Sequence, residues 1–277
     1  MTKRATKKIR FEKIKTIYRK ELKELLKNRE ITITIIIMPI VFSLLVPASM
    51  LALNFTDIED PGDTSQVTDI FSKIAPYWND LDNVQKLAVL QANMFLAFLI
   101  MIPMVVPMAI ASDSIAGEKE RKTIESLLAA PISEEEIMIG KALAATIPTI
   151  IISWIAEIIY IIFTDVILYN VIGQRIVLPN IFAGIMFILL VPAQTLLSTL
   201  IMTAVSSRSR GSREALQKSG FLVAPYMMVI AAIIFVPFVI HPLLTLASGA
   251  MIIGLCYLLL KLASRNFKRD KLLSVGS

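Results

Sequence analysis

This chain of 277 residues has very few side chains suited to metal binding or covalent chemistry. It contains one cysteine, Cys256, and one histidine, His241. A single cysteine excludes an intramolecular disulfide and argues against a thiolate metal site. A single histidine excludes the helix with two zinc-binding histidines that many metalloproteases use. No catalytic, cofactor-binding or metal-binding residue is predicted.

Two motifs of nucleotide and ester hydrolysis are also missing. A phosphate-binding loop reads Gly-x-x-x-x-Gly-Lys-Ser/Thr. Here the Gly140–Lys141 pair is followed by Ala142, and Glu135 stands where the first glycine is needed. No Gly-x-Ser-x-Gly sequence is present for a serine hydrolase. The chain is therefore predicted not to be an enzyme.

Charge is scarce and apolar sequence is abundant. Only 18% of the residues are charged, 56% are hydrophobic, and the mean hydropathy is +0.70. Apolar runs of about 20 residues are long enough to cross a bilayer as helices. The sequence predicts an all-α polytopic membrane protein with six transmembrane helices. The expected spans are 31–53, 87–112, 142–168, 181–205, 221–240 and 243–260, with a large outer loop at 54–86.

The last two of these spans have soft boundaries. Only His241 and Pro242 separate them, and Pro237 lies close by. A full hairpin at the outer surface is one solution for residues 237–248. Irregular backbone within the membrane is another, and it would have to be buried within protein.

The first 30 residues predict an amphipathic helix. Residues 2–30 carry twelve Lys or Arg and four Glu. Apolar side chains recur at helical spacing and define one stripe, with the charges opposite. Such a helix lies in the headgroup plane, where its cations face anionic lipid. Residues 1–30 are accordingly expected to be a cytoplasmic interfacial helix, and 31–277 a single transmembrane domain. The stripe consists of Phe11, Ile14, Tyr18, Leu22 and Leu25.

The distribution of basic residues predicts the orientation. With a cytoplasmic N-terminus, the inner segments hold 25 Lys or Arg and the outer loops hold 3. Cytoplasmic loops of membrane proteins carry this excess of positive charge. The expected location is therefore the cell membrane, crossed several times, with both termini in the cytoplasm. No nucleic-acid partner is expected, because the basic residues follow membrane side rather than form one patch.

The segment 113–141 is a charged insertion between the second and third predicted spans. It is longer than a linker needs to be, and Pro131 interrupts its helical pattern. Ser133 followed by Glu134, Glu135 and Glu136 is a strong helix start, because a serine N-cap and acidic first-turn residues satisfy free amides. The segment predicts one helix, a break, and a second helix beneath the bundle.

The segment resembles one found in ABC type-2 transporter permeases. The similarity lies in an acidic-basic pair, a threonine, a glutamate, a Leu-Leu pair, a proline followed by serine, and a Gly-Lys pair in that order. Lys122 replaces a glycine that is common in the family. The six-span layout is also similar, with Ser206 to Gly220 corresponding to the second cytoplasmic loop of sodium-extrusion-type members. Related permeases have short re-entrant helices before the final span, and the resemblance implies one near residues 237–248. The matching positions are Glu120, Arg121, Thr123, Glu125, Leu127, Leu128, Pro131, Ser133, Gly140 and Lys141.

The resemblance implies a function. In that family this segment is a coupling helix seated on a separate ATPase subunit, and two permease subunits form the transporter. ATP and Mg²⁺ are then expected on the partner ATPase, and the second permease subunit is either identical or different. A solvated helix face is the alternative explanation of the charges. The implied ATPase contact consists of Glu118, Glu120, Arg121, Thr123, Glu125, Leu128 and Pro131.

One carboxylate falls inside a predicted span. Glu157 lies in the third span, and an intramembrane carboxylate indicates a functional position by default. Gln91 and Asn93 enter from the outer end of the second span and, being two residues apart, point to different helix faces. They and Glu157 are candidate pathway residues. A protonated Glu157 in an interhelical hydrogen bond is an equally good explanation.

Three functions follow, and the cargo stays open. The first is the permease subunit of an ATP-driven exporter. The second is an ion-coupled secondary transporter that uses Glu157, although no inverted repeat is visible. The third is a membrane scaffold for an ATPase that transports nothing.

Overall fold

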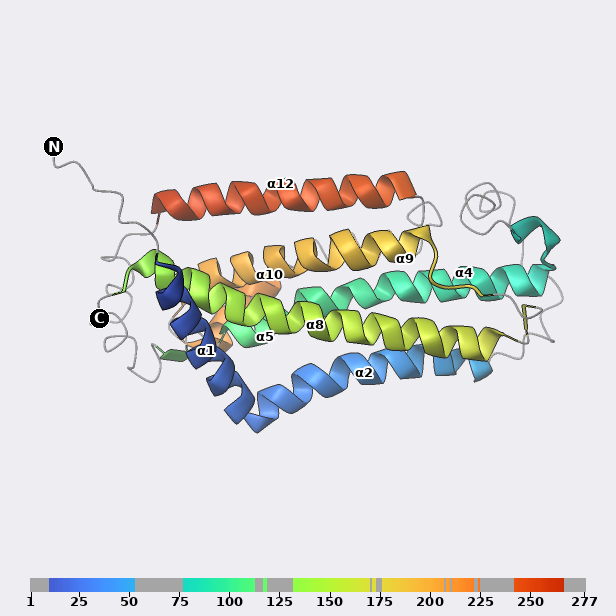
Figure 1. Ribbon diagram of the computed structural model, residues 1–277, viewed down its shortest axis with the longest axis horizontal. Helices are drawn as coiled ribbons and strands as arrows, with labels where there is room; N and C mark the ends of the chain where they lie inside the picture. The colour runs from blue at the N-terminus through green and yellow to red at the C-terminus, as the bar shows by residue number, and fades with distance from the viewer. Residues whose placement is uncertain are drawn as a thin grey trace.

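The computed structural model describes residues 10–52, 77–112, 117–118, 132–169, 171–172, 176–206, 208–209, 211–221, 224 and 242–266. Within these ranges the chain is almost entirely helical and contains no strand. The long helices run side by side along the longest axis of the molecule, and α1 crosses them at one end (Figure 1). The predicted all-α class is confirmed for the described residues.

The described helices have the following bounds. The N-terminal helix is α1 (Phe11–Lys27), and α2 (Arg29–Ala52) follows it. The next segment consists of α4 (Asn83–Phe98), η3 (Leu99–Met101) and α5 (Ile102–Ser112). After α8 (Glu134–Leu168) come α9 (Ile181–Ile185), η5 (Met186–Leu190) and α10 (Val191–Ser206), and the final helix is α12 (Pro242–Asn266).

Among the residues that the structure describes, three stretches are long and apolar enough to cross a membrane: Asn83–Ser112, Glu136–Leu168 and Ile181–Ser206. Two shorter apolar helices, Ile35–Met50 and Leu246–Leu258, lie within α2 and α12. The predicted fifth span, 221–240, lies outside the described residues except for Phe221 and Ala224. Of the region where a re-entrant helix was an option, residues 242–248 belong to α12 as one continuous helix.

Proline explains the irregular turns within two of these stretches. Pro103 has no N–H for the carbonyl of Leu99, and the helix tightens into the 3₁₀ turn η3 at that residue. Pro192 likewise leaves the carbonyl of Ile188 without its usual donor, and η5 is a π-helical turn around that residue.

The helix α8 extends well beyond the thickness of a bilayer. Its 35 residues span about 52 Å, whereas the hydrocarbon core is about 30 Å thick. The second helix expected in segment 113–141 is therefore not a separate element beneath the bundle. It is the first two turns of α8, and no residue between Ser133 and the predicted third span breaks the helix.

The helix α1 packs on these first turns with a face that contains Ile14 and Ile17. Ile14 and Ile17 are buried, whereas Phe11 is 75% exposed. Tyr18, Leu22 and Leu25 are half-buried. The buried face of α1 is thus rotated from the predicted stripe toward Ile17, because α8 packs on that side of the helix.

Candidate functional site

The site begins at the N-terminus of α8, where the predicted cap is confirmed. The hydroxyl of Ser133 accepts the amide of Glu136 at 3.2 Å, and the Glu136 carboxylate accepts the amide of Ser133 at 2.9 Å. This reciprocal capping box satisfies two amides that have no partner within the helix. The other oxygen of Glu136 accepts the backbone amide of Arg10 at 2.8 Å. One carboxylate therefore ties the starts of α8 and α1 together.

One turn further on, a glycine lets the two helices approach closely. A Cβ atom on Gly140 would lie 2.8 Å from the side chain of Ile17 and 3.2 Å from the carbonyl oxygen of Ile14. Contacts this short are not tolerated by carbon atoms, so α8 needs a glycine at this point. The close approach of α1 and α8 thus explains the glycine of the Gly140–Lys141 pair in the family motif.

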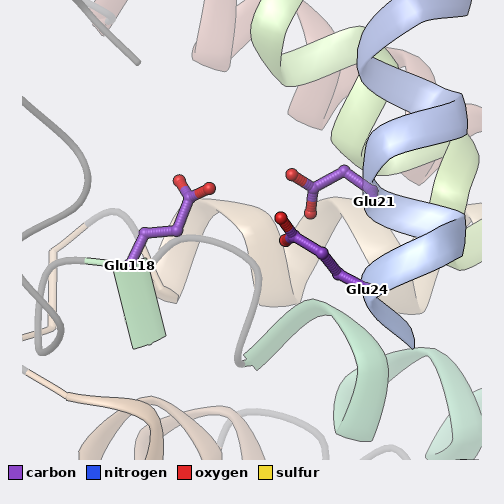
Figure 2. A group of neighbouring side chains, drawn as sticks. All are labelled: Glu21, Glu24 and Glu118. Carbon is purple, nitrogen blue, oxygen red and sulfur yellow. The ribbon is translucent and has the colours of Figure 1, made fainter. Parts of the chain in front are cut away.

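Lys141 joins three segments that are far apart in the sequence. Its ammonium nitrogen lies 2.8 Å from Oε1 of Glu21 on α1 and 3.0 Å from Oε2 of Glu118. The exposed fractions of the three side chains are only 3%, 9% and 7%. Figure 2 shows the carboxylates of Glu21 and Glu24, both on α1, pointing toward that of Glu118 across a narrow space.

Lys20 completes this group of side chains, which we call the charge cluster: Lys20, Glu21, Glu24, Glu118 and Lys141. Lys20 Nζ lies 2.9 Å from Glu118 and 3.4 Å from Glu24. Burial alone would lower the pKa of Lys20, but its hydrogen bond to Glu118 and the neighbouring carboxylates raise this pKa above its ordinary value. Lys20 is therefore charged at neutral pH.

The cluster has the carboxylates of a metal site but a different balance of charge. Oxygen atoms of Glu21, Glu24 and Glu118 lie within 4.8 Å of one another. Two ammonium groups stand among these three carboxylates and supply the positive charge that a cation would bring. The arrangement is consequently that of an ion-pair network between helices.

The structure describes only part of the predicted ATPase contact. Glu118 is buried in the charge cluster rather than presented on the surface. The other predicted contact residues lie outside the described residues: Glu120, Arg121, Thr123, Glu125, Leu128 and Pro131. Sequence reasoning missed Lys20, Glu21 and Glu24. A signal was present, since Glu21 follows Ile14 and Ile17 at helical spacing on the same face and is a carboxylate among apolar residues.

Deeper in the bundle, α8 presents a polar face to its neighbours. The Thr146 hydroxyl donates to the Thr199 hydroxyl of α10 at 3.2 Å, and the Tyr160 hydroxyl donates to the Ala92 carbonyl of α4 at 2.7 Å. Glu157 lies between these two contacts on the same face and is 2% exposed. This face consists of Thr146, Thr149, Ser153, Glu157, Tyr160 and Thr164, all buried.

The other two candidate pathway residues do not hydrogen-bond to Glu157. Asn93 donates to the carbonyl of Val89 and accepts from Asn180 at 2.6 Å. The Gln91 side-chain oxygen is buried and has no partner among the described residues. The structure brings Asn93 to Asn180, a pairing that helical spacing within one span does not reveal.

The comparison with known families covers nearly the whole chain. The model of the family described as "ABC-2 family transporter protein" matches residues 15–267. This chain belongs to the ABC-2 transporter family. It is therefore a membrane permease, a transport component of a kind that is generally not enzymatic. No curated protein and no solved structure matches the chain.

The extent of the match bears on the site. It begins within α1, before Lys20, and continues past the end of α12. All five residues of the charge cluster and the polar face of α8 thus lie inside the part shared with other ABC-2 permeases. Permeases of this family normally work with an ATPase subunit.

Proposed function

We propose that this permease is the membrane-spanning subunit of an ATP-driven exporter, and that the charge cluster transmits force from a separate ATPase subunit into the bundle. One observation carries the proposal: buried Lys141, at the base of α8, pairs with Glu21 of α1 and with Glu118 of the predicted coupling segment. A displacement of that segment would move both helices, because its carboxylate is bonded to lysines on each of them.

The proposed topology has six spans, an interfacial α1, a coupling helix in segment 113–141, and both termini in the cytoplasm. Figure 1 supports it, because α1, the start of α8 and the end of α12 lie at the same end of the molecule. The excess of basic residues in these segments assigns that end to the cytoplasm. In this topology residues 1–30 form the interfacial part and residues 31–277 the transmembrane domain, and α1 packs against that domain.

The proposed assembly contains two permease subunits and two ATPase subunits, and it binds ATP and Mg²⁺ on the ATPase. The surface that touches the ATPase is assigned to residues beyond Glu118: Glu120, Arg121, Thr123, Glu125, Leu128 and Pro131. Glu118 itself connects this surface to the bundle. Contact and transmission are therefore separate tasks of the same segment.

Two variants separate the two tasks. In the first, Glu120→Lys and Arg121→Glu are combined; in the second, Lys141→Met removes the central cation of the cluster. Each is co-expressed with candidate ATPase subunits from the same organism, and co-purification and ATPase activity in nanodiscs are measured. Lys218→Met is the matched control, because Lys218 forms an exposed pair with Glu214 outside the cluster.

We expect the combined variant to lose the ATPase during purification. Lys141→Met should retain the ATPase but lose the change in ATP hydrolysis that the permease causes. Co-purification and coupled hydrolysis that are both unaffected by deleting residues 124–131 would rule out the proposed coupling role.

A further inference from the structure

The interior of the permease contains oxygen atoms that have no hydrogen-bond partner among the residues described above. On α8 these are both carboxylate oxygens of Glu157 and the hydroxyl oxygens of Ser153 and Thr164, none of which has a partner among the described residues. The three side chains are 2%, 4% and 0% exposed, respectively. Buried polar groups are nearly always hydrogen-bonded, so a group of exceptions on one helix face needs an explanation.

Glu157 lies well inside α8, far from both ends of the helix. It lies 11 residues before Leu168, about 16 Å along the helix, and 16 residues after Lys141, about 24 Å in the other direction. Ser153 lies one turn before Glu157 on the same face, at the spacing at which side chains on a helix meet.

On the described helices packed against the middle of α8, ionisable side chains occur only at the helix ends. Neither α5 nor α10 has an ionisable side chain. On α2 and α4 such groups occur only in the first turn, and those of α1 lie at the start of α8 around the charge cluster. On α8 itself Tyr160 donates to Ala92, and Asp165 accepts the amides of Val177 and Leu178 at 3.0 Å. The first-turn groups are Arg29 and Glu30 on α2 and Lys86 on α4.

An ionised carboxylate is unstable in such surroundings. A buried charge without a counter-ion or donors takes up or loses a proton rather than stay charged. Glu157 in this conformation is therefore a neutral carboxylic acid. A bound proton neutralises the carboxylate without requiring space for a larger ion.

A structural irregularity at the same depth offers a way for the proton to leave. Trp154 precedes Glu157 by one turn, and its indole N–H donates to the carbonyl of Phe187 at 2.8 Å. The two rings stack with centroids 5.0 Å apart. Phe187 belongs to the π-helical turn η5, and turns of this kind are frequent at functional sites. A rearrangement of η5 would move Trp154 and the helix face next to it.

We propose that Glu157 is a proton-binding site inside the bundle, occupied in the described conformation and emptied when movement at η5 admits water. On release, the O–H bond of the carboxylic acid breaks, the proton passes to water, and a carboxylate is left. Proton binding concerns this chain alone. Release during transport rests on the proposed function, since it requires a cycle driven by the ATPase.

Carbodiimide labelling tests the binding step without any ATPase. Dicyclohexylcarbodiimide enters bilayers and reacts with protonated carboxylic acids, so the full chain in nanodiscs is treated across a range of pH and the labelled peptides are identified by mass spectrometry. We expect labelling at Glu157 that declines as the pH rises, is lost in Glu157→Gln, and persists in Asp165→Asn. Because Gln is a neutral isostere of the acid, Glu157→Gln should fold and melt like the parent chain.

Three results would overturn the proposal. The first is protection of Glu157 by Na⁺ or K⁺ at constant pH, which would indicate an alkali-ion site. The second is the absence of labelling at every pH, which would indicate that another group already bonds the carboxyl. The third is labelling that does not change with pH.

A second labelling experiment adds the co-purified ATPase with ATP and vanadate. Altered labelling of Glu157 supports proton release during the transport cycle. Unaltered labelling removes that step, while co-purification still tests the exporter itself.

Discussion

Removal of the Lys141 charge should destabilise the permease strongly. Its ammonium group lies 2.8 Å from Glu21 and 3.0 Å from Glu118. With an effective dielectric constant of about 20, each pair has a Coulomb attraction of about 6 kcal/mol. The cost of removing these groups from water offsets most of that attraction. Breaking a buried network by deleting one partner nevertheless costs about 3–5 kcal/mol, because the remaining charges stay buried.

The substitution Lys141→Met keeps most of the side-chain volume and removes only the charge. In the charge cluster this substitution leaves Lys20 as the one cation among three carboxylates. The carboxylates of Glu21 and Glu118 then repel each other. For a domain of this size, a loss of about 3–5 kcal/mol lowers the midpoint of thermal unfolding by roughly 10 °C. Thermal unfolding of the purified chain in detergent, followed by intrinsic tryptophan fluorescence, measures this shift.

Two comparisons make the result interpretable. Lys218→Met deletes an exposed ion pair, which contributes at most about 1 kcal/mol, and should leave the midpoint nearly unchanged. Adding Glu118→Gln to Lys141→Met should recover part of the loss, because one of the repelling charges is gone. If Lys141→Met shifts the midpoint no more than Lys218→Met does, the cluster does not hold α1 against α8.

Two further predictions concern close contacts between helices. Gly140→Ala should lower the free energy of unfolding by about 1–3 kcal/mol, because the new methyl group would overlap Ile17. Gly184→Ala is the control, because a Cβ atom there meets no atom within 4 Å, and the unfolding midpoints of both variants check the difference. Trp154→Phe keeps a ring for stacking but removes the donor to the Phe187 carbonyl, so it should lower the free energy of unfolding by about 1 kcal/mol. Equal stability of this variant and the parent chain would contradict the role of that hydrogen bond.

Much of the helical framework is readable from local sequence. Ser133 and Glu136 have the side chains of a capping box, and α8 begins where they predict. Pro103 and Pro192 lie next to the 3₁₀ and π turns, since each removes a backbone donor. These features depend on residues within one or two turns of each other, which is the range that a sequence pattern describes.

The helix faces were less predictable. Hydrophobic periodicity placed Phe11 on the apolar stripe of α1 and left out Ile17, but Ile17 is buried and Phe11 is exposed. Periodicity shows that a helix is amphipathic, whereas the covered side depends on where a neighbour touches it. Here that neighbour is α8 at Gly140, where the absence of a side chain permits the closest approach.

The sequence by itself determined that this is an apolar, helical membrane protein without the motifs of an enzyme, and it singled out segment 113–141 and Glu157. Only the tertiary structure decided that Lys141 pairs with Glu21 and Glu118 and that Glu157 has no partner in the described part of the chain. The physical reason is range. Caps, kinks and spans arise from neighbours along the chain, but the partner of a buried charge is set by how helices pack, and residues 120 positions apart meet only in the folded bundle.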